Sequence, residues 1–64
     1  MLKVIEVLAE SPTSWEDAAK VAIQNASKTV RNIKSINIEN LQATVENGAI
    51  KAYRVNAKLS FVLE

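Results

Sequence analysis

The chain has 64 residues, a net charge of +1 and neither cysteine nor histidine. Disulfides, thiolate or imidazole metal sites and a histidine general base are therefore excluded. A chain this short hides only about 60% of its unfolded surface when it folds alone, and small domains without covalent links are commonly stabilised by association. We expect a single domain, residues 1–64, that works as a subunit of a homo-oligomer.

Charge and hydropathy patterning exclude two classes of partner. Acidic and basic residues are interspersed, so the sequence lacks the basic stripe of a nucleic-acid-binding protein. The apolar runs are much too short to cross a membrane, and the N-terminus lacks the apolar region of a signal peptide. A cytoplasmic location is the simplest expectation.

The first half of the chain predicts a strand and a helix. Residues 2–9 are rich in β-branched side chains and predict a strand, which Pro12 ends because it lacks an N–H. Ser14 followed three residues later by Asp17 is typical of a capping box at a helix start. Alanines and valines then recur every four residues, so we expect the helix to span residues 15–31.

The second half predicts a long hairpin. The dipeptide Asn47-Gly48 between two β-type runs is typical of a two-residue turn, because both positions favour positive φ. Glu46 then faces Ala49, and a regular register continues outward from this pair. The order of elements is β-α-β-β, an α+β fold in which a three-stranded antiparallel sheet wraps around one helix.

That register sorts the hairpin onto two faces. The face towards the helix would carry Ile36, Ile38, Asn40 and Gln42 opposite Leu59, Ala57, Val55 and Tyr53. The other face would be polar at Asn37 and Glu39 but apolar towards the turn, at Leu41, Ala43, Val45, Ile50 and Ala52. Five contiguous apolar residues predict an oligomer interface. The alternative is a bulge near Asn40, which would swap the faces and place these residues in the domain's own core.

The chain offers little for catalysis. No serine has a histidine to activate it, and the carboxylates are scattered without the spacing of a calcium loop. One glycine cannot form a glycine-rich phosphate loop. Trp15 is either a ligand platform or, more simply, an anchor of the helix start on the sheet. We expect no enzyme activity.

Four segments resemble the dodecin family, in the same order of strand, helix and long hairpin. They are residues 11–19 (SPTSWEDAA), 28–33 (KTVRNI), 53–55 (YRV) and 59–64 (LSFVLE). The resemblance covers residues 3–64. It implies that twelve copies assemble as four trimers into a hollow shell, in which paired flavin rings lie between subunits. A tryptophan at the start of the second strand stacks on the flavin, and a glutamine in the last strand binds the ring edge.

This sequence departs from the flavin-binding pattern at both positions. Ser35 stands at the tryptophan position and Arg54 at the glutamine position. A serine supplies no aromatic surface for FMN or riboflavin, whereas a guanidinium suits a carboxylate or phosphate. The pattern is similar to the branch named calcium dodecin, although no calcium ligands are assigned. Two interpretations stay open: a shell with weakened flavin binding or another small anionic ligand, and a ligand-free or calcium-binding shell.

Overall fold

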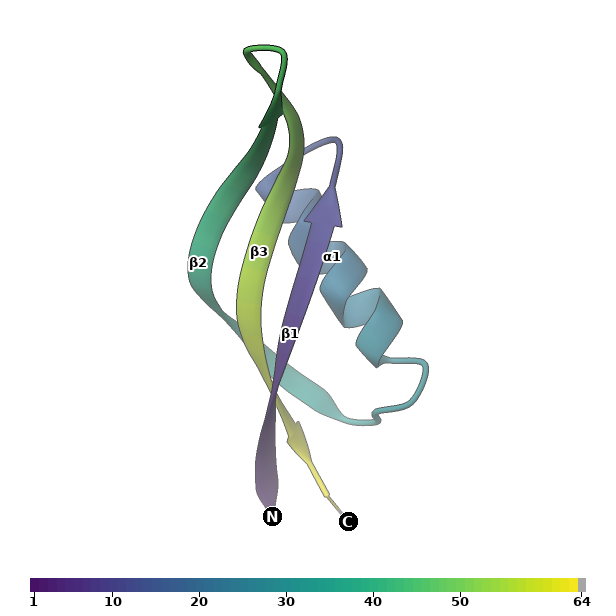
Figure 1. Cartoon of the computed structure of the whole chain (residues 1–64). Coiled ribbons are helices and arrows are strands. Elements are labelled where there is room, and N and C mark those ends of the chain that lie inside the picture. The colour runs from purple at the N-terminus through teal and green to yellow at the C-terminus, as the bar shows by residue number, and fades with distance from the viewer. Residues whose placement is uncertain (64) are drawn as a thin grey trace.

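The computed structural model describes residues 1–63, which form three strands and one helix (Figure 1). The elements are β1 (Leu2–Ser11), α1 (Trp15–Ala26), β2 (Ile33–Glu46) and β3 (Ala49–Val62). The strands pair antiparallel in the order β1-β3-β2, and α1 lies across one face of the sheet. The predicted α+β fold and its β-α-β-β order are confirmed. Glu64, the last residue of the segment that resembles dodecins, lies outside the described residues.

The first strand is longer than predicted. It continues past residue 9 because β3 is long enough to pair with it as far as Ser11, which lies opposite Tyr53. Pro12 follows immediately and ends the pairing. The last residue of β1 is therefore held next to the start of the helix.

The helix begins where the sequence predicts. The Ser14 hydroxyl accepts a 3.0 Å hydrogen bond from the Asp17 N–H, as a capping residue does. The second half of the capping box differs, because the Asp17 carboxylate accepts a 2.6 Å hydrogen bond from the Ser11 hydroxyl. Asp17 therefore joins the helix start to β1.

The helix ends at Ala26, five residues before the predicted end at residue 31. The N–H groups of Ser27, Thr29 and Val30 satisfy carbonyls of the last turn, and Asn32 then adopts a positive φ of 60°. Thr29 and Val30 are β-branched and stiff in a helix, so they favour leaving it here.

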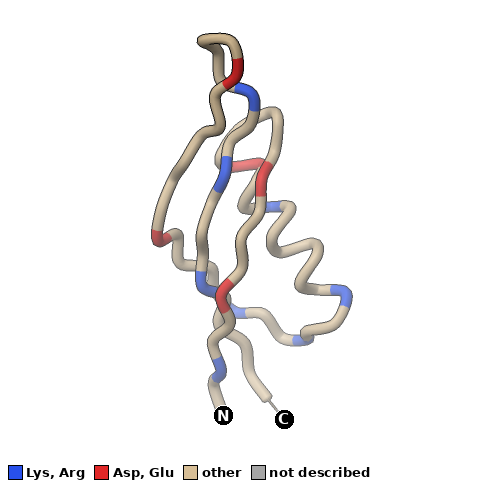
Figure 2. The backbone as a smooth tube through the Cα atoms, viewed as in Figure 1, with Lys and Arg blue, Asp and Glu red and all other residues tan. Residues whose placement is uncertain are grey.

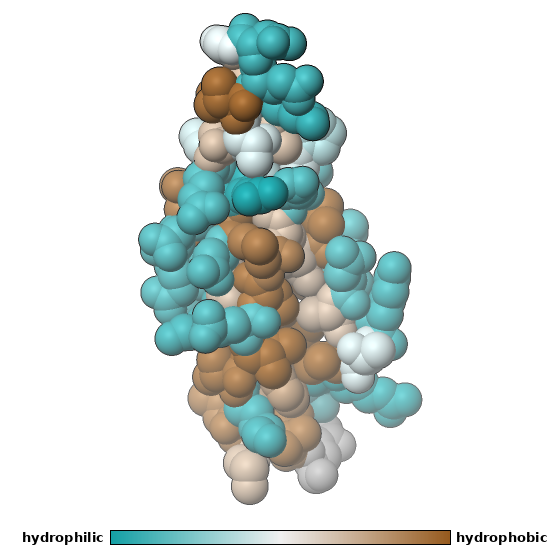
Figure 3. Space-filling model, in the orientation of Figure 1, coloured by the Kyte–Doolittle hydropathy of each residue, from teal (hydrophilic) through white to brown (hydrophobic). Residues whose placement is uncertain are grey.

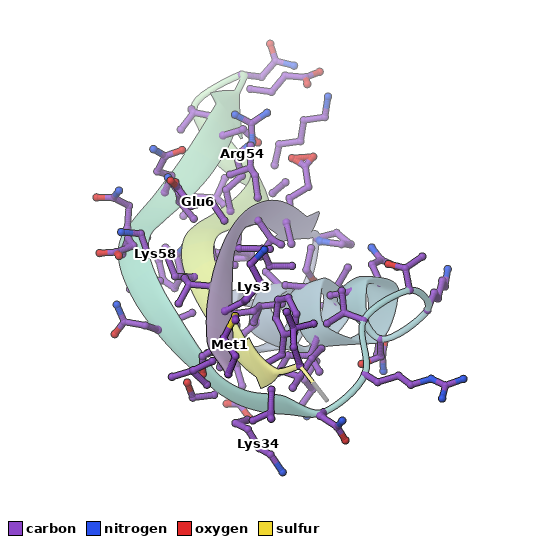
Figure 4. All side chains as sticks on the ribbon, turned by 90° about the horizontal axis from the view of Figure 1, so that it is seen from below. Met1, Lys3, Glu6, Lys34, Arg54 and Lys58 are labelled. Atoms are coloured by element: carbon purple, nitrogen blue, oxygen red, sulfur yellow. The ribbon has the colours of Figure 1, made fainter. Side chains whose placement is uncertain are left out.

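The hydrophobic core lies between α1 and the strands β1 and β3. Alanines 18 and 22 of the helix pack close to the sheet, where Val55, Ala57 and Leu59 are almost completely buried. The helix scarcely touches β2, so much of that strand stays uncovered on the helix side. We call the face of the sheet that carries the helix the inner face, and the opposite one the outer face (Figure 4).

The predicted hairpin turn is confirmed. Asn47 and Gly48 both have positive φ, 54° and 78°, and Glu46 lies opposite Ala49. Positive φ at both central positions gives the turn the twist of the strands that it joins. The tip of this hairpin extends well beyond α1 (Figure 1).

The predicted register is confirmed next to the turn and again from Ile36 to Ile38, but it is wrong between Asn40 and Thr44, because bulges interrupt it. Ile38 pairs with Ala57 as expected, but Asn40 lies opposite Asn56 rather than Val55, with Glu39 as the extra residue between them. A second shift lies between Thr44 and Val45, near the tip, and a third between Ile33 and Ser35, at the start of β2. A bulge places an extra residue in one strand, so it changes which side chains share a face.

The bulges move most of the predicted interface residues to the inner face. Leu41 and Ala43 now lie opposite Val55 and Tyr53, and Val45 lies opposite Ile50 on the same face. Ala52 is the exception, because it pairs with Thr44 on the outer face. The alternative of a bulge near Asn40 is therefore correct in that these side chains change face. It is wrong in placing them in the domain's own core. Leu41, Val45 and Ile50 keep 58%, 67% and 52% of their surface exposed, because the helix scarcely touches β2 and does not reach the hairpin tip.

Candidate functional site

Arg54 lies on the outer face of β3, opposite Glu10 of β1. Its Nε donates to Glu10 Oε1 at 3.1 Å, and the two residues line a small hollow of about 250 Å³ with Leu8 and Ala9. A guanidinium has five N–H donors, so this contact leaves the terminal fork for a planar acceptor. The arrangement suits a carboxylate, a phosphate or the edge of a polar ring.

Ser35 lies at the start of β2, also on the outer face. It pairs with Ser60 of β3, and the two hydroxyls share a hydrogen bond. Both side chains are small, so this end of the outer face presents hydroxyl groups rather than an aromatic surface. Ser35, which stands where the flavin-binding pattern has tryptophan, therefore offers a hydroxyl group and no ring on which a flavin could stack.

One subunit does not bring Ser35 and Arg54 together. Ser35 lies beside Ser60, which is six residues from Arg54 along β3. At a rise of about 3.4 Å per residue, the two positions are about 20 Å apart on the same face. A site that uses both residues would need Ser35 of one subunit and Arg54 of another.

Trp15 anchors the start of the helix to the sheet. Its indole Nε1 donates a 2.7 Å hydrogen bond to the backbone carbonyl of Gln42, and its ring meets the Tyr53 ring edge-on at 4.8 Å between centroids. These contacts agree with the simpler of the two sequence interpretations. An aromatic ring held in this way fixes the angle between α1 and the hairpin.

A larger groove lies on the helix side, between the end of α1 and the start of β2. Its volume is about 660 Å³, and its lining combines apolar and basic residues: Ile23, Ser27, Val30, Arg31, Asn32, Ile33, Lys34, Ser35 and Ile36. Sequence reasoning missed this groove, because the helix was expected to continue through residues 27–31. It also missed Glu10 as the partner of Arg54, since 44 residues separate them.

Carboxylates do not gather in this subunit. Within residues 1–63, no group of three or more Asp or Glu side chains could hold a metal ion. Glu10, Glu39 and Glu46 each form an ion pair with a basic residue. Across the same residues, no helix is long and apolar enough to cross a membrane.

Comparison with known proteins places the chain in a family. A family model described as Dodecin matches residues 1–64. The chain belongs to the dodecin family. It is 36% identical to the calcium dodecin of Mycobacterium tuberculosis over 59 residues, which are 92% of this chain and 83% of that protein. It is 27% identical to the dodecin of Thermus thermophilus over 62 residues, or 97% of this chain and 90% of that one.

Solved structures of dodecins share the fold over the whole chain. The dodecin of Streptomyces coelicolor superposes with a TM-score of 0.96 at 30% identity, covering all of this chain and 91% of that one. A crystal structure of the calcium-chelating calcium dodecin of M. tuberculosis gives a TM-score of 0.86 at 35% identity, with the same coverage. The family that the four sequence segments resemble is thereby confirmed.

Proposed function

We propose that this dodecin is a subunit of a hollow shell of twelve copies, arranged as four trimers, that binds a small ligand at sites shared between subunits. The separation of Ser35 and Arg54 by about 20 Å on one face carries this proposal. Within one subunit, Ser35 lines the 660 Å³ groove and Arg54 lines the separate 250 Å³ hollow, so no single pocket holds both residues. The two positions belong to one site only when subunits meet.

The shape of the subunit supports association. A compact domain of this length has a radius of gyration of about 11 Å and exposes about 4,000 Å². This chain has a radius of gyration of 12.9 Å and an accessible surface of 4598 Å², because the hairpin tip extends beyond the helix. Leu41, Val45 and Ile50 are exposed apolar residues that the bulges place on the inner face, with Ala43 beside them, and we propose that they form a subunit interface there.

The ligand that fits this altered pocket best is a small anion or a weakly held flavin. Ser35 cannot stack on an isoalloxazine ring, which removes about 1 kcal/mol or more of aromatic interaction beyond the buried area. Arg54 supplies a planar donor fork beside the Leu8–Glu10 hollow. FMN and riboflavin are therefore weaker ligands here than in a dodecin with a tryptophan, and the phosphate of FMN favours it over riboflavin.

A calcium-binding or ligand-free shell is the second candidate. The relative from M. tuberculosis is described as a calcium dodecin, and its structure as having a novel calcium-binding site. Calcium takes six to eight oxygen ligands, and no carboxylate cluster in residues 1–63 of one subunit supplies them. Such a site would draw its oxygens from several subunits. In either form we propose a binding or storage role in the cytoplasm rather than an enzyme.

Two measurements test the proposal. Light scattering should give a mass near twelve times 7.0 kDa, and a monomer mass at all concentrations would overturn the shell. Titration of the assembled protein with FMN and with riboflavin should quench flavin fluorescence weakly and favour FMN. Calorimetric heat with calcium, and no response to either flavin, would instead favour the second candidate.

A further inference from the structure

Internal ion pairs leave an uneven distribution of charge. The pairs are Glu10–Arg54, Glu39–Lys58 and Glu46–Lys51. Three basic residues outside these pairs, Lys28, Arg31 and Lys34, gather between the end of α1 and the start of β2 (Figure 2). Positive charge at a helix C-terminus is favourable, and this accounts for Lys28. Arg31 and Lys34 lie further on and line the 660 Å³ groove.

This basic groove has an apolar floor, and no acid among residues 1–63 lines it. Ile23 of the helix and Ile36 of β2 face it, and both are only partly covered. Figure 4 shows the Lys34 side chain extending from the start of β2 away from the rest of the subunit, where a second copy could reach it. A complementary surface would be apolar and carry a carboxylate.

The chain itself carries such a surface on the outer face of β1. Val4 and Leu8 are 56% and 65% exposed, and Glu6 lies between them (Figure 3 shows the apolar surface along this strand). Lys58 lies opposite Glu6 in the register, but its Nζ is paired with Glu39 at 3.4 Å. Glu6 forms no ion pair with any of the described residues.

Among residues 1–63, the other acids outside the ion pairs already have a role within the subunit. Glu16 lies in the first turn of α1, where negative charge stabilises the helix dipole, and Asp17 accepts the hydrogen bond from Ser11. Glu6 has no comparable role. Its position between two exposed apolar residues therefore points to a contact outside the subunit.

We infer that the Val4–Glu6–Leu8 strip of a second copy of this chain docks in the basic groove, where Glu6 meets Arg31 and Lys34. The inference rests on the shell proposed above and names one of its contacts. The strip and the groove are different surfaces, so the contact can repeat head to tail around a closed ring, such as one trimer of the proposed shell. It covers apolar surface from both copies and brings together charged side chains that form no ion pair among residues 1–63 of one subunit.

Charge exchange tests this contact. Glu6→Lys alone, and Arg31→Glu with Lys34→Glu, should each raise the subunit concentration at which the assembly dissociates by about tenfold or more, because like charges then meet at close range. Combining all three changes should restore most of the loss. Lys20→Glu, the same charge reversal on the exposed side of α1, is the matched control and should leave the dissociation unchanged.

A second measurement needs no variant. A carbodiimide joins a carboxylate to an amine only where they touch, so it should link Glu6 to Lys34 in the assembled wild-type protein. Mixing ¹⁵N-labelled and unlabelled chains before linking identifies links between copies by mass spectrometry. Links at other acid–lysine pairs without Glu6–Lys34 would overturn the inference.

The outcomes separate this inference from the shell itself. A wild-type monomer at all concentrations would overturn the shell. A wild-type assembly that withstands Glu6→Lys, or whose weakened variants are not restored by the combined changes, would overturn only the Glu6 contact. Far-UV circular dichroism of each variant checks that the subunit remains folded.

Discussion

Arg54 and Glu10 face each other across the β1–β3 pair, with Nε and Oε1 3.1 Å apart. Both side chains are about half exposed, so their ion pair contributes at most about 1 kcal/mol. An anionic ligand on the terminal fork of Arg54 would lie beside the Glu10 carboxylate and be repelled by its charge. The pair therefore weakens anion binding without contributing much to stability.

Replacing Glu10 by Gln should strengthen the binding of FMN by up to about fivefold, the equivalent of about 1 kcal/mol. The amide keeps the shape but removes the repelling charge. Riboflavin has no phosphate and should gain nothing, so it is the internal control in fluorescence titrations at low salt. An equal gain for both flavins would contradict a role for Arg54 in holding the anion.

Replacing Ser35 by Trp should raise the affinity for both flavins by at least about tenfold, because the indole adds stacking and buried apolar area. Asn37→Trp is the matched control, since it places the same ring two residues along the same strand and face. Quenching of flavin fluorescence measures both variants. Unchanged affinity in Ser35→Trp would mean that this position is not next to the ligand.

Replacing Leu41 by Asp should dissociate the assembly, because it buries an unpaired charge in the interface that we propose on the inner face. Asn40→Asp introduces the same carboxylate one residue earlier, where the side chain lies on the outer face opposite Asn56. Light scattering should therefore show a smaller mass for Leu41→Asp only. Equal masses for both variants would remove the hairpin tip from the interface.

Replacing Ser11 by Ala should destabilise the folded subunit by about 1–3 kcal/mol, because it leaves buried polar groups without partners. The Ser11 side chain is almost completely buried, donates to Asp17 and accepts a 3.0 Å hydrogen bond from the Thr13 N–H. Urea unfolding at one fixed protein concentration measures the loss, since association itself adds stability. Thr13→Ala, at an exposed side chain outside the groove, keeps its backbone N–H and should lie within about 0.5 kcal/mol of wild type.

The helix start and the hairpin turn could be predicted from the sequence. Ser14 and Asp17 identify a helix start and Asn47-Gly48 a tight turn, because each signal depends on neighbouring residues. The end of the helix could not be predicted in the same way. Residues 27–31 continue the helical periodicity, and only the β-branched Thr29 and Val30 argue against it.

The bulges and the site depend on contacts between distant residues. The apolar spacing from Ile38 to Leu41 breaks strict alternation, and this is the one local sign of the bulge at Glu39. No local pattern indicates that Glu10 meets Arg54 or that the groove lies beside Ser35. These contacts follow from the strand order, which places β1 and β2 on either side of β3.

The bulge at Glu39 also affects how functional positions are carried between relatives. Because the bulge adds one residue to β2, the inward positions change from even numbers, as at Ile38, to odd numbers, as at Leu41. Consider a dodecin that lacks this extra residue. An ungapped alignment with it would match inward-facing residues of one protein with outward-facing residues of the other, from Asn40 to the hairpin turn. Alignments across this stretch should therefore place the gap at the bulge and match residues by face rather than by count.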